Sequence, residues 1–347
     1  MSRPNHSTPS RKQQHVALTL SKDVGFKSKT TGLEQWDFVH NALPELNLSD
    51  VDTSTTFLGK TLSAPFMVSC MTGGYRDALN INRALAEVCE SEGIAMGVGS
   101  QRQAIEDNRY HQTFSVVREV APTIPMVGNL GAAEVAALTN ADGVQKLAEL
   151  INADAFTVHL NPLQEFLQPE GNTNFRGVLK GIELLVKHLA IPVIVKEIGA
   201  GISASVARRL LDVGVTFIDV AGAGGTSWAG VETLRRKDKA FASKFWDWGI
   251  PTATAVQQVS ALKSSTQFTL IASGGITSGF EAAKCIALGA DLAASARPLL
   301  KSLKEDGKAG LRSRIKNWTD ELRGVMFLTG SATIRELQKA QIVVVPT

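Results

Sequence analysis

The chain contains Ala153-Asp154-Ala155-Phe156-Thr157-Val158-His159-Leu160-Asn161-Pro162-Leu163-Gln164-Glu165, an apolar run that passes directly into a polar loop. The apolar half is typical of a buried strand, and the loop holds an imidazole, two side-chain amides and one carboxylate. In a repeated strand–helix protein, ligands bind at the carboxyl ends of the strands. One carboxylate can hold Mg²⁺ when substrate phosphates supply other ligands. Taken alone, His159 and Asn161 fit equally well as caps of the strand and the loop.

The same alternation of short apolar runs and amphipathic stretches continues from residue 64 onward. The pattern predicts strands at Pro65–Ser69, Ile94–Val98, Pro125–Asn129, Ala155–His159, Pro192–Lys196, Thr216–Val220, Ile250–Ala253 and Thr269–Ala272. It predicts helices at Ala78–Glu92, Arg109–Val120, Val144–Asn152, Arg176–Leu189, Ala204–Val213, Ala255–Lys263 and Phe280–Leu288. Eight parallel strands with right-handed helical crossovers close naturally into a barrel.

The predicted fold is therefore α/β, a (β/α)8 TIM barrel. Its strands are continuous apolar runs, as expected when both faces of a parallel sheet are buried. A doubly wound open sheet is the alternative, and it normally carries an early G-x-G-x-x-G fingerprint after its first strand. The first predicted strand is followed by Gly73-Gly74-Tyr75-Arg76, which does not supply that fingerprint.

We expect one domain with extensions. Residues 1–60 form an N-terminal extension, and residues 61–347 form the barrel together with C-terminal helices at Lys308–Leu328 and Ala332–Ala340. The first 30 residues are basic, with Asp23 as their acidic residue, and they lack a core-forming pattern. This tail is either a solvated arm or a mobile clamp for an anionic ligand.

Composition narrows the class of protein. The 347 residues are 44% hydrophobic with a formal charge of +3, which is too small to argue for nucleic acid. Cys70, Cys89 and Cys285 show no metal-ligand spacing, so we interpret them as buried thiols. The sequence lacks an apolar run of bilayer length and a secretory signal. These features predict a cytoplasmic enzyme without a membrane partner.

Glycine-rich and polar segments follow most of the predicted strands. They include Met71-Thr72-Gly73-Gly74, Gly99-Ser100-Gln101-Arg102, Asn129, Gly222–Trp228, Ser273-Gly274-Gly275-Ile276 and Ser295-Ala296-Arg297. The last strand–helix loops of this barrel usually bind phosphate. Backbone donors at a glycine pair and the positive end of a helix both favour an anion. The pattern favours a phosphorylated cofactor over simple turns.

Lys196 ends the fifth predicted strand and permits more than one interpretation. It could form a Schiff base, or stand as a fixed cation beside an electron-rich ring, or pair with Glu197. The phosphate site and the glycine-rich edges favour the second interpretation, with FMN as the ring. A cation near N1 and O2 of a flavin stabilises its anionic reduced form.

Together these motifs resemble the type 2, FMN-dependent isopentenyl-diphosphate isomerases over nearly the whole chain. The matching segments are Arg11-Lys12-x-x-His15, Met71-Thr72-Gly73-Gly74, Ser100-Gln101-Arg102, Gly128-Asn129, His159-x-Asn161-x-x-Gln164-Glu165, Lys196-Glu197, Gly224-Gly225-Thr226-x-Trp228, Gly274-Gly275 and Ala296-Arg297. Two departures are small: Gln14 stands where an acidic residue is common, and Cys70 replaces a small residue.

The resemblance implies an activity and its cofactors. The family interconverts isopentenyl and dimethylallyl diphosphate with reduced FMN and Mg²⁺, and uses NADPH only to reduce the flavin. One proton is added and another removed, with flavin N5 as the favoured acid/base. The family forms tetramers and octamers, so a homo-oligomer is expected.

The resemblance also assigns roles to residues. Substrate would be bound by Arg11, Lys12, His15, Ser100, Gln101, Arg102, His159, Asn161, Gln164 and Trp228. FMN would be bound by Met71, Thr72, Gly73, Ser100, Asn129, Lys196, Thr226, Gly275, Ile276, Thr277, Ala296 and Arg297. Glu165 would hold Mg²⁺. Lys196, Gln164 and His159 are the protein's candidate catalytic residues beside the flavin.

Two rivals come from other classes. A 2-hydroxyacid oxidase shares the barrel and phosphate site, but it needs a His and an Arg late in the barrel. This chain has Thr252-Ala253-Thr254-Ala255 after the seventh predicted strand, and its last His is His188. A non-enzymatic flavin or phosphate carrier would not need Glu165 and the basic N-terminal clamp together.

Overall fold

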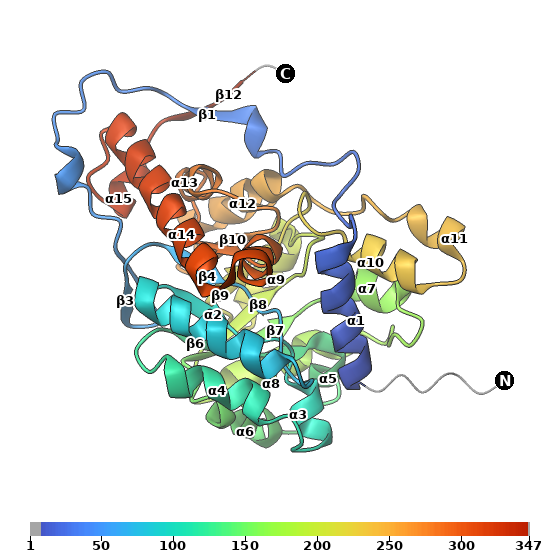
Figure 1. The fold of residues 1–347 in the computed structure, drawn as a ribbon. Helices are drawn as coiled ribbons and strands as arrows, with labels where there is room; N and C mark the ends of the chain where they lie inside the picture. The colour runs from blue at the N-terminus through green and yellow to red at the C-terminus, as the bar shows by residue number, and fades with distance from the viewer. Residues whose placement is uncertain (1–7, 346–347) are drawn as a thin grey trace.

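The computed structural model describes residues 8–345, and at its centre eight parallel strands form a closed barrel. The order around the barrel is β4 to β9, then β10 and β11, which pairs back onto β4 (Figure 1). The predicted α/β TIM barrel is confirmed. The strands are β4 (Phe66–Val68), β5 (Ala95–Gly97), β6 (Met126–Gly131), β7 (Ala155–His159), β8 (Val193–Lys196), β9 (Phe217–Asp219), β10 (Thr269–Ser273) and β11 (Leu292–Ser295).

Helices surround the barrel, and short helices fill several of the loops at the strand ends. The longer helices are α2 (Ala78–Glu92), α4 (Gln112–Val120), α6 (Asp142–Leu150), α8 (Val178–His188), α9 (Ala204–Asp212), α12 (Thr252–Ser260), α13 (Gly279–Ala287) and α14 (Arg297–Thr329). The shorter ones are α3 (Arg102–Glu106), α5 (Ala132–Val135), α7 (Pro162–Leu167), α10 (Trp228–Arg235), α11 (Lys239–Ser243) and α15 (Ile334–Leu337). Within residues 8–345, no helix combines the length and hydropathy needed to span a bilayer.

The prediction of a strand at Ile250–Ala253 is wrong. Pro251 makes only an isolated bridge with Ala223, and α12 begins at Thr252. Proline has no N–H to donate to a ladder and is well suited to the start of a helix. The barrel is closed instead by β11, which pairs with β10 and β4 and was not among the eight predicted strands. The Gly274-Gly275 loop therefore follows the seventh strand, and Ala296-Arg297 follows the eighth.

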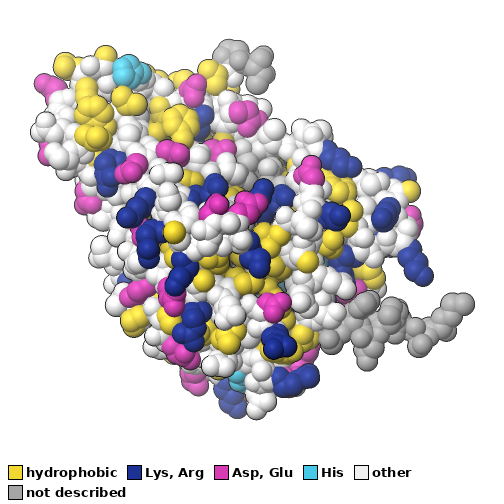
Figure 2. Space-filling view, viewed as in Figure 1, with side chains coloured by type: hydrophobic (Ala, Val, Ile, Leu, Met, Phe, Trp, Pro, Cys, Tyr) yellow, Lys and Arg dark blue, Asp and Glu magenta, His cyan; other side chains and the backbone are white. Residues whose placement is uncertain are grey.

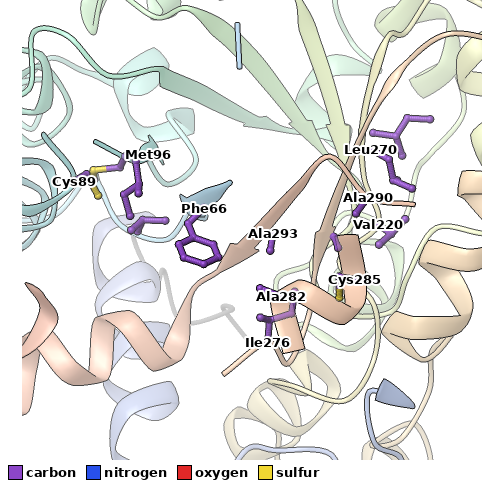
Figure 3. Packing of buried hydrophobic residues seen from close by; sticks show 14 of the residues in the cluster. Phe66, Cys89, Met96, Val220, Leu270, Ile276, Ala282, Cys285, Ala290 and Ala293 are labelled. Atoms are coloured by element: carbon purple, nitrogen blue, oxygen red, sulfur yellow. The ribbon is translucent and has the colours of Figure 1, made fainter. Parts of the chain in front are cut away.

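The strands are buried on both faces, as their continuous apolar sequences predict. Inside the barrel, a cluster that includes Met67, Val127, Ile194 and Ile271 packs with Phe57. Phe57 comes from the hairpin of β2 (Thr55–Phe57) and β3 (Lys60–Leu62). Outside the strands, a larger cluster joins them to the helices, and Figure 3 shows part of it around α13 and β11.

The N-terminal extension contains a helix that the sequence analysis did not predict, α1 (Thr8–Ser21). It lies beside α10 and the start of α14 (Figure 1). Farther along, β1 (Trp36–Phe38) pairs antiparallel with β12 (Ile342–Val344), so the extension and the C-terminal segment share a small sheet. The face seen in Figure 2 carries Lys and Arg side chains interspersed with Asp and Glu.

Candidate active site at the carboxyl ends of the strands

A cavity of about 500 Å³ lies at the carboxyl ends of the barrel strands, with α1 forming part of its wall. This is the end of the barrel at which such folds carry their active sites. Most of the residues singled out from the sequence line it. They are Arg11, Lys12, His15, Met71, Gly73, Ser100, Arg102, Asn129, His159, Asn161, Gln164, Glu165, Lys196, Thr226, Trp228, Gly275, Thr277, Ala296 and Arg297.

Three predicted binding residues do not line this cavity. Gln101 is fully buried, where its amide donates to Leu147 O (2.8 Å) and accepts from Asn129 N (3.1 Å). Its side chain therefore braces Asn129, and the substrate role that the resemblance implies for Gln101 stays a prediction. Thr72 donates its hydroxyl to the side chain of Asn82, and Ile276 belongs to the apolar core. The predicted loops line the cavity, but the sequence could not tell which of their side chains point into it.

The loops after β10 and β11 form a cradle for an anion. Gly274 and Gly275 have φ values of 101° and 76°, a region that favours glycine. A Cβ on neighbouring Gly225 would lie 2.5 Å from the Gly275 nitrogen, so the close backbone approach also needs glycine there. Ala296 precedes the first turn of α14 and offers no side-chain cap, which leaves N–H groups for a ligand. This donor set fits the phosphate of FMN.

Lys196 ends β8 and is 7% exposed, with its Nζ 2.5 Å from the carbonyl oxygen of Glu197. The Glu197 carboxylate does not pair with Lys196, because it turns away to accept from the N–H groups of Ile198, Gly199 and Ala200. Burial raises the pKa of Glu197, and these donors oppose the rise. The partner of Lys196 is therefore a backbone carbonyl and not the Glu197 carboxylate, and Lys196 lines the cavity.

His159 and Asn129 come from adjacent strands and form one unit. The His159 Nδ1 lies 2.8 Å from the Asn129 Oδ1. Burial, reinforced by the charges of Lys196 and Lys12, lowers the pKa of His159 to about 3. The imidazole is therefore neutral, and with Nδ1 donating to Asn129 its Nε2 is an acceptor. Donation from this His to a phosphate would require a change of tautomer or charge.

The loop after β7 brings Asn161, Gln164 and Glu165 together, because α7 starts at Pro162 and places them one turn apart. Asn161 Nδ2 donates to Gln164 Oε1 (3.1 Å) and to Glu165 Oε1 (3.0 Å). The other Glu165 oxygen accepts from Asn172 N (2.6 Å). Among the described residues, the buried Asn161 Oδ1 has no hydrogen-bond partner. Such oxygens suit Mg²⁺ once phosphates and waters complete the octahedron.

Glu232 on α10 does not line the cavity, but it contacts His15 and Gln164, which do, and the sequence analysis missed it. It is fully buried, 2.8 Å from His15 Nε2, 3.4 Å from Gln164 Nε2 and 2.6 Å from Arg235 Nη1. Burial favours the protonated acid, but His15 and Arg235 outweigh it and lower the pKa of Glu232. Its position four residues after Trp228 was a signal, since one helical turn aligns the two. Glu232 links α1 to the loop that carries Gln164.

The basic residues of α1 meet the cavity from the side. Lys12 Nζ donates to Gly73 O (3.0 Å) and to Ser100 O. Burial, followed by the charge of Arg11, lowers the pKa of Lys12 to about 7. At the other end of α1, the Arg297 guanidinium donates to Thr19 O (2.7 Å) and Lys22 O (3.1 Å), which favourably caps the carboxyl end of a helix.

Comparisons with known proteins identify the family of this chain. Residues 5–140 and 152–344 match the family model of FMN-dependent dehydrogenases. A protein from Pelodictyon phaeoclathratiforme named isopentenyl-diphosphate delta-isomerase is 48% identical over 99% of this chain and 99% of its own. One of the same name from Cronobacter sakazakii is 45% identical over 96% of each chain.

Solved structures show the same fold at lower sequence similarity. A mandelate oxidase with an FMN adduct superposes with a TM-score of 0.67 at 19% identity, covering 96% of this chain and 99% of its own. A lactate oxidase from Pediococcus acidilactici gives 0.70 at 16% identity, covering 93% and 89%. These likenesses extend to the fold alone, whereas the similarity to the isomerases spans the whole sequence. The chain belongs to the type 2, FMN-dependent family of isopentenyl-diphosphate delta-isomerases.

Proposed function

We propose that this protein interconverts isopentenyl diphosphate and dimethylallyl diphosphate in isoprenoid biosynthesis, with reduced FMN and Mg²⁺. The observation that supports it most is the convergence of three features on one cavity. These are the basic residues of α1, the Glu165 carboxylate and the Lys196 ammonium beside the glycine cradle. An anion clamp, a single oxygen-rich metal site and a fixed cation meet the needs of a diphosphate held beside a flavin.

FMN fits the cavity through residues of several strand ends. We assign its phosphate to the N–H groups around Gly275, Thr277 and Ala296, and its ring to the side of the cavity with Met71 and Lys196. The other proposed contacts are Gly73, Ser100, Asn129, Thr226 and Arg297. Bound in reduced form, the flavin supplies an electron-rich ring that stabilises positive charge and an N5 atom for proton transfer. NADPH is the proposed reductant.

The diphosphate would be bound jointly by α1 and the metal site. Arg11 and Lys12 would make charge-assisted hydrogen bonds to phosphate oxygens, and Ser100 and Arg102 line the same cavity. Glu165 would contribute the protein carboxylate for Mg²⁺, with the unpartnered Asn161 Oδ1 close by. Trp228 would wall the prenyl group.

The reaction moves a double bond with no net redox change, by adding one proton and removing another. Lys196 would stabilise negative charge on the reduced ring. Gln164, oriented by Asn161 and Glu232, and the neutral His159 are the polar side chains proposed to act at the hydrocarbon end. The wall made by α1 would exclude water, which would quench a carbocation-like state.

We extend the proposal to the setting of the enzyme. The family resemblance supports a homo-oligomer, a tetramer or octamer, and the sequence supports a cytoplasmic protein without a nucleic-acid partner. None of these properties is needed for the proposed mechanism.

The test is an anaerobic assay of the purified FMN-bound protein with isopentenyl diphosphate. We expect dimethylallyl diphosphate only when the flavin has been reduced and Mg²⁺ is present, with NADPH consumed once per flavin rather than once per turnover. Stoichiometric NADPH consumption, or turnover with oxidised flavin, would contradict the proposal.

A 2-hydroxyacid oxidase is the second candidate, because oxidases share the fold. The loop after the seventh barrel strand, Gly274-Gly275-Ile276-Thr277, contains no His. The segment after the predicted strand at Ile250–Ala253 contains none either. Hydrogen peroxide production from lactate or mandelate at a rate above the isomerase rate would favour the oxidase.

A further inference from the structure

Asp219 is a buried carboxylate to which the proposed function assigns no role. It is the last residue of β9 and is 3% exposed. In the β8–β9 ladder its Cα partner is Lys196, so both side chains leave the same face of the sheet. Asp219 Oδ1 accepts from Ser273 Oγ (2.5 Å) and from Ala221 N (3.2 Å), which holds the carboxylate in place.

Four ionisable side chains lie near enough to Lys196 to interact with its charge. His159, its other ladder partner, is neutral because its pKa is about 3. The Cys70 thiol is also neutral, because burial raises its pKa to about 11. Glu197 is turned toward its own loop. Asp219 is therefore the remaining counter-charge among the described groups that face Lys196.

We propose that Asp219 is a positioning residue that keeps Lys196 in its ammonium form beside the flavin. This inference rests on the proposed function, in which Lys196 is the cation at the reduced ring. An unpaired ammonium in a water-poor site tends to lose its proton, whereas a neighbouring carboxylate favours the charged form. Burial raises the pKa of Asp219 above its ordinary value, while the charge of Lys196 and the hydrogen bonds from Ser273 and Ala221 oppose that rise.

The number of protons taken up on flavin reduction depends on whether Lys196 is already charged. When Lys196 is already charged, reduction of the holoprotein takes up two electrons and one proton, and the product is the anionic reduced flavin. When the carboxylate is lost, Lys196 is neutral before reduction. The negative charge that reduction creates then draws a second proton from solvent, to the lysine or to the ring.

The measurement is potentiometric titration of the FMN-bound protein from about pH 7 to about pH 9, where a solvated lysine is charged. The slope of the midpoint potential against pH gives the number of protons per two electrons. We expect one proton for the wild type, two for Asp219→Asn and one for Cys70→Ser. The last variant alters another neighbour of Lys196 without removing a charge. One proton in Asp219→Asn, or a wild-type count that rises to two in this range, would overturn the inference.

A second measurement does not depend on bound flavin. Acetic anhydride modifies neutral amines, so we expect acetylation of Lys196 near neutral pH in apo Asp219→Asn and protection in the apo wild type, as read by mass spectrometry. Equal acetylation would overturn the inference even if the variant fails to hold FMN. A wild type that binds no FMN would instead contradict the proposed function, and the acetylation comparison would still test Asp219.

Discussion

At the scale of single residues, Glu165 is the side chain on which the metal hypothesis depends. It is the carboxylate of the loop after β7, and Mg²⁺ bound to a diphosphate usually takes one or two carboxylates. Glu165→Gln keeps the size and the contact with Asn161 but removes the charge. We expect FMN binding to persist, while the Mg²⁺ concentration for half-maximal rate rises by about 10-fold to 100-fold, as for damaged metal sites. An unchanged Mg²⁺ requirement would exclude Glu165 as a ligand.

Lys196 is the residue proposed to stabilise the anionic reduced flavin. In Lys196→Ala the anionic reduced flavin loses its cation, so we expect a lower midpoint potential, weaker FMN binding and a kcat reduced by about 100-fold or more. Potentiometry and steady-state kinetics on the same preparation check both effects. If potential and rate both stay at wild-type values, the role assigned to Lys196 is wrong.

Lys12 should make substrate binding dependent on pH. Its pKa, about 7 instead of 10.5, means that at about pH 8.5 the free enzyme holds Lys12 mostly neutral. A diphosphate stabilises the ammonium and raises that pKa, so binding should take up nearly one proton at this pH and almost none at about pH 6, where Lys12 is already charged. Calorimetry in two buffers of different ionisation heat measures the uptake. Lys12→Met should abolish it, and an equal uptake in this variant would assign the proton elsewhere.

At the scale of elements, α1 is the feature that sequence reasoning described least well. The lack of a core-forming pattern in residues 1–30 predicts a solvated arm or a mobile clamp and no helix, whereas in the structure contacts of Lys12, His15 and Arg297 hold α1 against the cavity. These partners come from distant segments, so no local pattern in residues 1–30 reveals them. The prediction of a strand at Ile250–Ala253 was wrong because a short apolar run has no periodicity that separates a strand from a buried helical turn.

Removing the first part of α1, which carries the proposed diphosphate contacts, should impair substrate binding without unfolding the barrel. Deleting residues 1–15 removes Arg11, Lys12 and His15 but leaves the barrel and the glycine cradle. We expect a folded, yellow protein with a greatly raised KM and a reduced kcat, and an exposed α1 residue supplies the control, Gln14→Ala. Protease cleavage within α1 of the full chain should slow when substrate and Mg²⁺ are added. Full activity of the truncated protein at low substrate concentration would show that residues 1–15 do not bind substrate.

At the scale of the whole molecule, the barrel and the loops that form the site could be predicted because they repeat. Each strand–loop–helix unit repeats the same apolar and glycine pattern, so one misplaced strand did not change the predicted fold. The direction of individual side chains could not be predicted. Gln101 turns inward to brace Asn129. Glu232 contacts Gln164 without lining the cavity, and Asp219 is the ladder partner of Lys196 at a strand end that carries no motif.

The central claim is that proton transfer takes place on reduced flavin without net redox chemistry. The most direct measurement mixes dimethylallyl diphosphate and Mg²⁺ with photoreduced FMN-bound protein in anaerobic D₂O, without nicotinamide, and follows both diphosphates by NMR. The account predicts conversion to isopentenyl diphosphate, deuterium in both species and a flavin that remains reduced throughout. Deuterium-free substrate after long incubation, or product formation matched by flavin oxidation, would contradict it.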